Sequence, residues 1–537
     1  MATETKINDK EGDIMRTKFR RTVFCILSIA VFLFQTAYAY DIKSPSALRN
    51  ADIEALAAQP KFDGREYGIV TPVRDQGNTS LCWAYASANA SETSILRKGI
   101  DPKVTARACF LSPQQIGYAK YNRGSDPLGN TEGETTSPGN EWLNSNGGTE
   151  YVAGLLSTWC GPVAAALPYN INGWEYAAYK LENAIAVDGS KLADHAEERE
   201  KMKRAIVKYG AVTFSYMYAT ETERYNPNNV TGGTQHACTV IGWDDTLPAE
   251  SFVPGGAKLD GGWLIKNSYH SLEYFYLSYD VNCRQASYAF DYAENGKYDY
   301  NYFYDAKPGD FGMGSMLKCT KAANVFEAKK GTPEKTEQIK AVSVGIAGEN
   351  TICTVEIYTN VPEGSFDPKG AIPAASKTVH LEYGGFRCIE LDEPVEIEKG
   401  SSFAVVAEVQ NGYITLNESI GKSYVYTGSW TPQPAAPRIK AFTKTERKAY
   451  VEFISESQVK VFAENGVKYL ALARYEAGVL KNIRIEPIDF DLVKEKTLPL
   501  PDGWERTEST VCKAFLWENL NSLRPLCRAA ELSLKRL

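Results

Sequence analysis

Histidine is scarce in this 537-residue sequence, and the cysteines form no closely spaced pair. Four histidines stand at positions 195, 236, 270 and 380, and none of the eleven cysteines belongs to a C-x-x-C motif. Structural zinc sites are usually built from such closely spaced ligands. An EF-hand loop for calcium is also absent. We therefore expect no resident metal ion and no cofactor.

Long basic runs are missing as well, and the formal net charge is −7. A protein whose main partner is nucleic acid would carry a basic surface instead. Beyond the first forty residues, no apolar run reaches the about 20 residues that a membrane-spanning helix needs. The hydrophobic fraction of 43% and the charged fraction of 23% are ordinary for a soluble globular protein. We expect neither nucleic acid nor, after removal of the N-terminal segment, a membrane as partner.

The N-terminal segment, residues 1–39, has the pattern of a signal peptide. Residues 15–21 are mostly basic, residues 23–34 are almost wholly apolar, and Ala37-Tyr38-Ala39 is an A-x-A cleavage site. A transmembrane anchor is the alternative, but the apolar run is short and the small residues at its exit favour cleavage. We therefore expect a secreted, extracellular or cell-surface protein. Export permits disulfides, although the sequence does not tell how the ten remaining cysteines would pair.

The chain is too long for one hydrophobic core, which stops growing near about 250–300 residues. Residues 40–61 are expected to form a pro-segment or N-terminal arm. Residues 62–300 mix helical and strand patterns and predict an α+β domain. Residues 301–445 predict an all-β sandwich, and residues 446–537 predict a further β domain.

Apolar periodicity predicts the elements of these domains. In the α+β domain it predicts helices over 82–98 and 197–209, and strands over 211–216, 237–243 and 262–266. Residues 119–148 are rich in Gly, Asn, Ser, Thr and Pro and predict a surface loop. The β domains show short apolar runs between turns, at 339–346, 353–359, 377–381, 402–409, 439–442, 459–462, 469–473, 483–485 and 514–517.

Cys82 is the cysteine whose surroundings point to chemistry. A turn-rich loop, residues 71–81, leads directly into the predicted helix, so Cys82 stands at the helix start. The free amides and the dipole of a helix N-terminus stabilise an anion, which favours the nucleophilic thiolate. Gln76 lies six residues upstream, where its amide could donate to a developing oxyanion. A buried, inert cysteine is the alternative for any single cysteine.

The motifs around Cys82 resemble the papain-like cysteine peptidase family. The resemblance covers residues 62–285 and rests on T-P-V-x-x-Q-G and C-W-A near Cys82, L-S-P-Q-Q at 111–115, N-G-G at 146–148, Q-H-A at 235–237, K-N-S at 266–268 and Y-F-Y-L-S-Y at 274–279. It implies that Cys82 is the nucleophile and His236 its base, that Asn267 orients the imidazole, and that Gln76 donates to the oxyanion. It also implies that Gly147, Gly148 and Trp83 bind the substrate.

The other histidines are weaker candidates for the base. His270 lies three residues after Asn267 and is the rival to His236, whereas His195 stands in a charged helical stretch and His380 in the β region. The sequence also departs from the family pattern. Thr79 and Asn146 stand where relatives have two cysteines joined by a disulfide, and Tyr269 replaces the usual tryptophan after Asn-Ser. The long inhibitory pro-region of plant and lysosomal members is missing.

The region after the peptidase resembles the bacterial subgroup in which a lectin-like domain follows. Segments 155–163 and 242–245, with 322–326 and 391–395 in the β domain, carry this likeness to clostridial cell-wall cysteine proteases that process surface-layer protein. Residues 446–537 look like an Ig- or fibronectin-like module. The resemblance alone suggests calcium in the lectin-like domain. Asp299, Asn301 and Asp305 are more readily interpreted as solvated turn residues.

The predicted function is peptide-bond hydrolysis by a Cys-His-Asn acyl-enzyme mechanism in a secreted or cell-surface endopeptidase. Its partners would be protein or peptide substrates, with cell-wall glycan or surface-layer protein as further candidates. The alternative is a surface adhesin or glycan-binding protein with a vestigial peptidase domain. A peptidoglycan amidase or transglutaminase is a third interpretation, but neither predicts the Gln76 position or the Lys-Asn-Ser segment.

Overall fold

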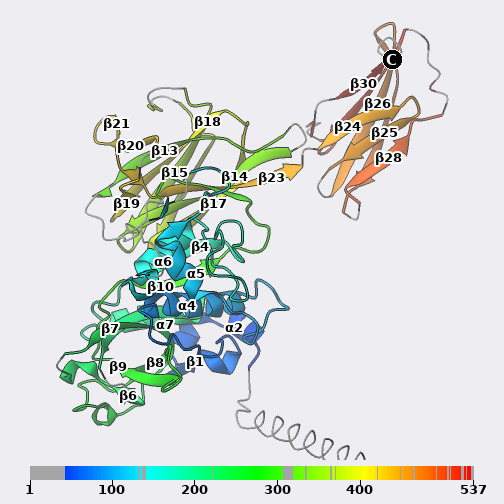
Figure 1. Ribbon diagram of the computed structural model, residues 1–537. Coiled ribbons are helices and arrows are strands. Elements are labelled where there is room, and N and C mark those ends of the chain that lie inside the picture. The colour runs from blue at the N-terminus through cyan, green and yellow to red at the C-terminus, as the bar shows by residue number, and fades with distance from the viewer. Residues whose placement is uncertain are drawn as a thin grey trace, which may run out of the picture. The chain divides into compact units, whose positions relative to one another are not determined.

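The computed structural model describes residues 43–533 except 131–133, 136–140, 220–221, 231, 306–317, 333–334, 363–365, 369–370, 420, 448, 464–465, 492, 503, 505–506, 508, 522–524 and 528. The predicted signal peptide therefore lies outside the described residues. The chain divides into two compact units (Figure 1). The first comes from Met1–Gly124 and Glu134–Ala293, and the second from Ser125–Gly133 and Glu294–Leu537.

Helix α4 (Cys82–Lys98) is the central helix of the first unit, and it has the bounds that the sequence predicted. Its residues from Trp83 to Leu96 are all buried, on every side of the helix. The run is rich in Ala and Ser, whose small side chains let other elements pack closely around it. The buried serine hydroxyls cause no penalty, because Ser87 and Ser91 each donate to the carbonyl four residues earlier, at 2.8 Å.

Five further α-helices and four short 3-10 helices accompany α4 in the described part of the first unit. The α-helices are α2 (Pro45–Arg49), α3 (Ile53–Ala57), α5 (Pro113–Ala119), α6 (Thr149–Ser157) and α7 (Ala196–Tyr209). The 3-10 helices are η1 (Gly64–Tyr67), η2 (Glu141–Asn144), η3 (Pro227–Asn229) and η4 (Ala249–Ser251). Helix α7 confirms the helix predicted over 197–209. Ser112 caps α5 by accepting from the Gln115 amide, as expected for a serine before a helix.

A six-stranded sheet packs against these helices in the order β1-β7-β8-β9-β6, with β5 also paired to β7. The strands are β1 (Lys61–Asp63), β5 (Val212–Tyr218), β6 (Arg224–Tyr225), β7 (Thr234–Asp244), β8 (Gly262–Lys266) and β9 (Tyr274–Ser278). All pairs are antiparallel except β6–β9. A bond from Thr239 Oγ1 to the Ala86 carbonyl, 3.0 Å, joins β7 to α4. Strands β4 (Leu181–Val187) and β10 (Ser287–Tyr292), also in this unit, pair with each other antiparallel.

The expected surface loop at 119–148 is only partly a surface loop. Strands β2 (Asn122–Arg123) and β3 (Glu134–Thr135) pair within it, and η2 follows. Trp142 is 1% exposed and packs edge-on against Tyr118 at 5.7 Å between ring centroids. Leu128 is buried in the core of the second unit. A turn-rich composition predicts the chain reversals correctly, but it does not reveal single anchoring residues such as these.

Two antiparallel sheets enclose one core in the second unit. The first contains β17-β14-β19-β12, with β23 paired to β14 and β11 and with β22 paired to β19, and the second has the order β16-β15-β18-β13-β20-β21. Inward residues of both sheets form the shared core, among them Val344, Ile357, Phe403 and Ile439. The all-β sandwich predicted from the alternating apolar runs is confirmed.

The strands of this sandwich range from two residues in β12 and β22 to 14 residues in β17. They are β11 (Tyr300–Tyr302), β12 (Lys318–Cys319), β13 (Lys321–Glu327), β14 (Lys335–Ala347), β15 (Thr351–Thr359), β16 (Ala375–Leu381), β17 (Gly384–Ile397), β18 (Ser402–Gln410), β19 (Tyr413–Asn417), β20 (Ser423–Tyr426), β21 (Trp430–Pro432), β22 (Ala436–Pro437) and β23 (Ile439–Arg447).

The C-terminal segment has two sheets and a core of its own. The sheets are β24-β25-β28 and β27-β26-β29-β30. Buried residues from both, such as Val459, Leu472 and Leu516, form one cluster. The strands are β24 (Tyr450–Ser455), β25 (Gln458–Phe462), β26 (Val467–Glu476), β27 (Val479–Asp489), β28 (Glu495–Pro499), β29 (Thr510–Trp517) and β30 (Ala530–Ser533). The more specific Ig- or fibronectin-like assignment stays a prediction.

The interpretation of Asn301 and Asp305 as solvated turn residues is wrong. They are 6% and 1% exposed, and Asp305 forms an ion pair with Lys440, which is itself fully buried. Asp299 accepts from the Thr445 amide at 2.8 Å. Lys440 and Thr445 stand on β23, far along the chain from their partners, which local sequence patterns could not indicate.

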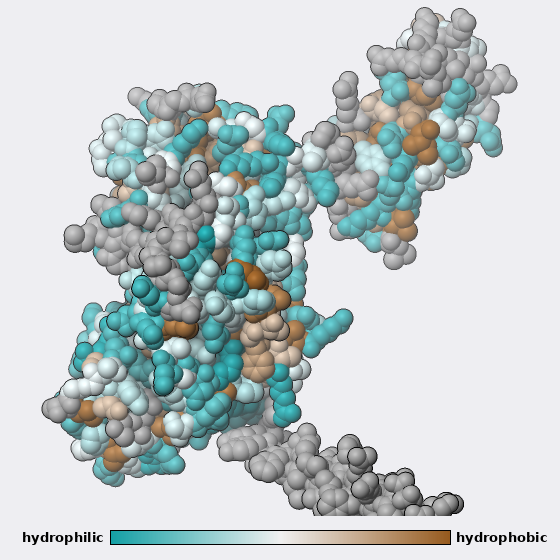
Figure 2. Space-filling model, in the orientation of Figure 1, coloured by the Kyte–Doolittle hydropathy of each residue, from teal (hydrophilic) through white to brown (hydrophobic). Residues whose placement is uncertain are grey.

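The face drawn in Figure 2 carries both hydrophilic and apolar residues. On the face shown in Figure 2, apolar residues occur in small groups among hydrophilic ones, as is usual for protein surfaces. Within the part of the chain that the structure describes, no helix is long and apolar enough to cross a membrane. None of the ten cysteines from Cys82 onward forms a disulfide.

Candidate active site

Cys82 is the first residue of α4, at the end of the loop that the sequence placed there. That loop is held against the end of β8, because the backbone N–H of Gln76 donates to the Ser268 carbonyl at 2.9 Å. The Thr79 hydroxyl donates back to the Gln76 carbonyl at 2.8 Å and closes the turn. The loop, the helix start and the end of β8 therefore meet at one place.

His236 lies on β7, and Asn267 directly follows the neighbouring strand β8. The two side chains meet there. His236 Nε2 and Asn267 Oδ1 lie 3.0 Å apart, and both residues are buried, at 5% and 1% exposed. Asn267 is itself fixed, since its Nδ2 donates to the Leu272 carbonyl at 3.0 Å and its Oδ1 accepts from the Ser268 amide at 2.8 Å. Because the bond to Asn267 uses Nε2, the second ring nitrogen of His236, Nδ1, takes no part in it.

Aromatic rings surround this hydrogen bond. Tyr269 stacks on the His236 ring, with 5.5 Å between centroids and 26° between planes. Tyr216 and Tyr218 lie at 5.8 and 5.7 Å from it. Tyr269 thus occupies the place expected from its position after Asn267-Ser268, and its ring covers one face of the imidazole. Rings in these positions keep water from the His236–Asn267 bond.

Burial and backbone amides act in opposite directions on the Cys82 thiol. Burial, the larger effect, raises the pKa of Cys82, while the amides of Ala237, Trp83 and Cys82 itself lower it. Ala237 directly follows His236, so the thiol lies beside the strand that carries the imidazole. Burial likewise lowers the pKa of His236, and the bond to Asn267 opposes this. Each group taken alone is therefore favoured in its neutral form.

Gln76 is buried, and its side-chain amide is held at both ends. Its Oε1 accepts from Ser268 Oγ at 2.6 Å, and its Nε2 donates to the Thr79 carbonyl at 2.7 Å. These two bonds determine the orientation of the amide. The Nε2 group has a second hydrogen besides the one given to Thr79. Sequence reasoning did not identify Ser268 as the partner that orients Gln76, although both lie in the motifs that carried the resemblance.

Gly147 and Gly148 precede α6, and Trp83 lies directly behind them. A Cβ atom added to Gly147 would come within 2.3 Å of Trp83 Cε2. Trp83 is only 1% exposed, and its indole packs directly against Gly147, where a side chain would leave it no room. Its assignment as a substrate-binding residue stays a prediction.

The rival His270 is placed differently from His236. Its ring is more than half exposed and pairs with Glu273, with Nδ1 3.1 Å from Oε1. His195 is also half exposed and lies 3.4 Å from Glu197, and His380 belongs to β16 in the second unit. Of the four histidines, His236 is thus the buried one, bonded to Asn267 and next in sequence to Ala237, whose amide acts on the Cys82 thiol.

A buried polar network behind α4 was not foreseen from the sequence. Lys266, fully buried on β8, donates to Thr71 Oγ1 at 2.7 Å and to Asn89 Oδ1 at 2.9 Å. Thr71 also bonds to Glu92, which accepts from Arg74 at 2.5 Å. Burial lowers the pKa of Lys266 to about 7. Because Lys266 immediately precedes Asn267, this network ties the end of β8 to the helix that begins with Cys82.

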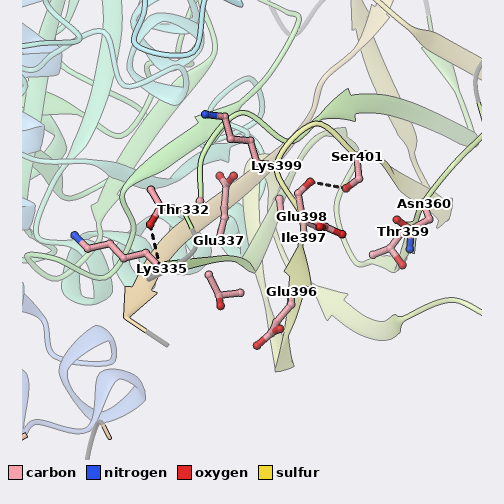
Figure 3. Close-up of a pocket in the computed structure, with 12 residues that line it drawn as sticks. Thr332, Lys335, Glu337, Thr359, Asn360, Glu396, Ile397, Glu398, Lys399 and Ser401 are labelled. Atoms are coloured by element: carbon pink, nitrogen blue, oxygen red, sulfur yellow. Dashed lines mark hydrogen bonds between the residues drawn. The ribbon is translucent and has the colours of Figure 1, made fainter. Parts of the chain in front are cut away.

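The second unit has a polar hollow of about 720 Å³ at the ends of β14 and β17 (Figure 3). Glu337 lines it, but its carboxylate already accepts from Tyr302, Thr443 and the Lys330 amide at 2.7–3.1 Å. Glu396, Glu398, Lys335 and Lys399 are exposed, so the lining presents both charges. Such a lining suits a polar ligand with hydrogen-bonding groups. The described residues contain no cluster of His, Cys, Asp and Glu suited to a metal ion.

Two protein families match the chain. Residues 58–292 match the papain family cysteine proteases, and residues 302–427 match the lectin like domain. Rattus norvegicus procathepsin L is 22% identical over 214 residues, which are 38% of this chain and 55% of the relative. Gallus gallus cathepsin K is 26% identical over 224 residues, which are 40% and 55%. The chain thus spans about half the length of these curated relatives.

Solved structures give the same combination of domains. The clostridial cysteine protease Cwp84 after propeptide cleavage matches with a TM-score of 0.56 and 18% identity, over 72% of this chain and 99% of that one. A structure of the cysteine protease and lectin-like domains of Cwp84, a surface layer associated protein of Clostridium difficile, gives the same score and identity over 72% and 89%. At this identity the likeness shows a shared fold. The chain therefore contains a papain family cysteine protease domain at residues 58–292 and a lectin-like domain at residues 302–427.

Proposed function

We propose that this protein is a cysteine endopeptidase in which Cys82 attacks the peptide bond and His236 transfers the proton. The observation that carries the proposal is the buried 3.0 Å contact between His236 Nε2 and Asn267 Oδ1, next to the Ala237 amide that bonds to the Cys82 thiol at the start of α4. Asn267 orients the ring so that Nδ1 serves the thiol. Peptidase-family membership and the shared fold with Cwp84 support the same chemistry.

The proton balance of the first step favours the pair over either group alone. Burial holds Cys82 and His236 in their neutral forms individually. Transfer of the thiol proton to Nδ1 creates two opposite charges next to each other in a low-dielectric site, which stabilises both. The amides of Ala237, Trp83 and Cys82 favour the thiolate further. The thiolate is then the nucleophile.

The remaining steps follow from this ion pair. The sulfur attacks the scissile carbonyl carbon, and Gln76 Nε2 with the Cys82 amide donates to the resulting oxyanion. His236 returns its proton to the leaving amine as the C–N bond breaks, which leaves a thioester on Cys82. Water, deprotonated by His236, hydrolyses the thioester and frees the thiol. Gly147 and Gly148 bind the main chain of the substrate segment before the scissile bond.

Replacement of the nucleophile tests the proposal. The Cys82→Ala variant removes the sulfur and is expected to lose peptide cleavage entirely, because the nucleophilic atom itself is gone. Cleavage of a peptide library is measured by mass spectrometry, and Cys527→Ala in the second unit serves as the matched control. Turnover retained in Cys82→Ala, or lost equally in Cys527→Ala, would contradict the assignment of the nucleophile.

We further propose that the protein is exported and acts outside the cell or at its surface. The support is the signal-peptide pattern of residues 1–39, together with the surface-layer association printed for the structurally similar Cwp84. Cleavage after Ala39 would leave Tyr40 as the mature N-terminus. N-terminal sequencing of the protein recovered from culture medium or cell surface checks this position, and an uncleaved N-terminus would contradict it.

Glycan binding by the lectin-like domain is the second candidate function. The match over residues 302–427 and the polar hollow of Figure 3 favour it. In an adhesin with a vestigial peptidase, binding to cell-wall glycan would remain while Cys82 would be unreactive. Glycan-array binding by the Cys82→Ala variant, measured beside cleavage by the unaltered protein, distinguishes a binding protein from a peptidase that also binds glycan.

A further inference from the structure

Lys120, the C-cap residue of α5, carries a charge that is almost completely buried in the peptidase unit. The residue is 5% exposed, and its Nζ donates to the Asn146 carbonyl at 2.9 Å. The centroids of the Tyr151, Tyr121 and Trp83 rings lie 4.1, 4.7 and 5.3 Å from Nζ. An ammonium within about 6 Å of an aromatic ring is attracted by it, more strongly when water is excluded. The ammonium is therefore held at one place by α4, α5 and α6 together.

The carbonyl that Lys120 binds belongs to the residue just before Gly147 and Gly148. The same carbonyl accepts from the Tyr121 hydroxyl at 3.3 Å. Trp83, which lies under Gly147, is also one of the rings around the Lys120 ammonium. The glycine segment thus rests on a group of side chains centred on one buried cation.

Glu150 gives Lys120 a second role on the other side of the glycines. Burial raises the pKa of Glu150, and the positive charge of Lys120 opposes this. A Cβ atom added to Gly148 would come 2.3 Å from Glu150 Oε1, so the carboxylate lies over that glycine. The cation therefore acts on the Asn146 carbonyl before the glycines and on the Glu150 carboxylate after them.

No disulfide among the described cysteines fixes this segment. The ten cysteines from Cys82 onward form no disulfide, so hydrogen bonds and packing hold the segment. The loop before α4 is joined to the segment by a backbone bond from the Ser80 amide to the Leu143 carbonyl, 2.8 Å. We propose that Lys120 is a positioning residue that holds Asn146–Gly148 in place for substrate binding. The inference rests on the proposed peptidase function.

The Lys120→Met variant tests this role in the full-length protein. Methionine keeps most of the length and apolar packing but removes the charge and the hydrogen bond. We expect KM for peptide substrates to rise roughly tenfold, the equivalent of one charged hydrogen bond, with kcat changed less than about twofold. Alkylation of Cys82 by iodoacetamide, which needs no substrate segment, should keep its rate. Lys103→Met, at an exposed lysine, is the matched control and should behave like the unaltered protein.

A second measurement does not depend on activity. Hydrogen exchange of peptides covering residues 143–149 should become faster in Lys120→Met and stay unchanged in Lys103→Met. Lys120→Arg keeps the charge and can stack on the rings, so its KM should lie close to that of the unaltered protein. An unchanged KM and unchanged exchange in Lys120→Met would overturn the inference, while peptide cleavage that is blocked by alkylation of Cys82 would leave the proposed function standing. A raised KM together with an equally large fall in kcat and in the alkylation rate would also overturn the inference, because that pattern indicates general collapse of the site.

Discussion

At the scale of single residues, the central question is how a half-buried neutral thiol and a buried neutral imidazole become an ion pair. Burial lowers the pKa of His236 and raises that of Cys82. Only the mutual attraction of thiolate and imidazolium can reverse both tendencies at once. The proposed mechanism therefore needs the two residues to titrate as a coupled pair.

This coupling predicts a change in the titration of His236 when the thiol is removed. In Cys82→Ala the imidazole keeps only its burial and its bond to Asn267, so its pKa should fall below the ordinary 6.5. In the unaltered protein the thiolate should raise it well above the variant's value. The ring signals of the four histidines, followed by NMR against pH, measure both. Identical titration curves for His236 in the two proteins would rule out the ion pair.

The contact between Gly147 and Trp83 gives a steric prediction. Gly147→Ala would place Cβ 2.3 Å from the rigid indole, and relief of such overpacking costs about 1–3 kcal/mol. We expect a lower melting temperature. Gly148→Ala is the matched control for stability, because its Cβ meets the end of the Glu150 side chain, which can shift, instead of a rigid ring. Thermal unfolding of both variants provides the check, and an equal drop in melting temperature at the two positions would contradict the role given to Trp83.

At the scale of elements, sequence reasoning succeeded where periodicity and local motif agree. Helix α4 has the predicted bounds, and β8 spans the predicted residues 262–266. It failed where one residue is anchored by a distant partner. Trp142 is buried inside a turn-rich segment, and Asp305 pairs with Lys440 on a strand far along the chain. Spacing along a sequence carries no information about such tertiary pairs.

The network between β8 and α4 also escaped prediction, and it makes stability depend on pH. Lys266 has a pKa of about 7 in the fold and about 10.4 when unfolded, so between these values the unfolded chain binds the extra proton. Stability from this group therefore rises with pH across the window and is lost as pH falls toward 7. As pH rises, the free energy of unfolding of the unaltered protein should increase relative to that of Lys266→Met. The difference should change by up to about 1.4 kcal/mol per pH unit.

Urea unfolding at several pH values between about 7 and 10 measures this difference. Lys103→Met, which removes an exposed lysine, should give a curve parallel to that of the unaltered protein. If the curve for Lys266→Met is parallel as well, the Lys266 ammonium is not destabilised by burial, and the network does not have the electrostatics described above.

At the scale of the whole molecule, the C-terminal sandwich is predicted to fold alone. The described residues of its core all lie between 449 and 530, and Val459, Leu472 and Leu516 are at most 1% exposed. A fragment of residues 446–537 should unfold cooperatively in urea, followed by circular dichroism. Leu472→Ala should destabilise it by about 2–5 kcal/mol through the cavity left behind. A gradual, non-cooperative transition of the unaltered fragment would contradict an independent domain.

The most direct test of the account is to identify the residue that a peptidyl epoxide modifies in the full-length protein. The account predicts that mass spectrometry finds the adduct on Cys82 and on none of the other nine described cysteines, that cleavage stops in proportion to labelling, and that His236→Ala suppresses the reaction. An adduct on another cysteine, or cleavage that persists with Cys82 fully modified, would contradict the claim that this thiol and this imidazole form the catalytic pair.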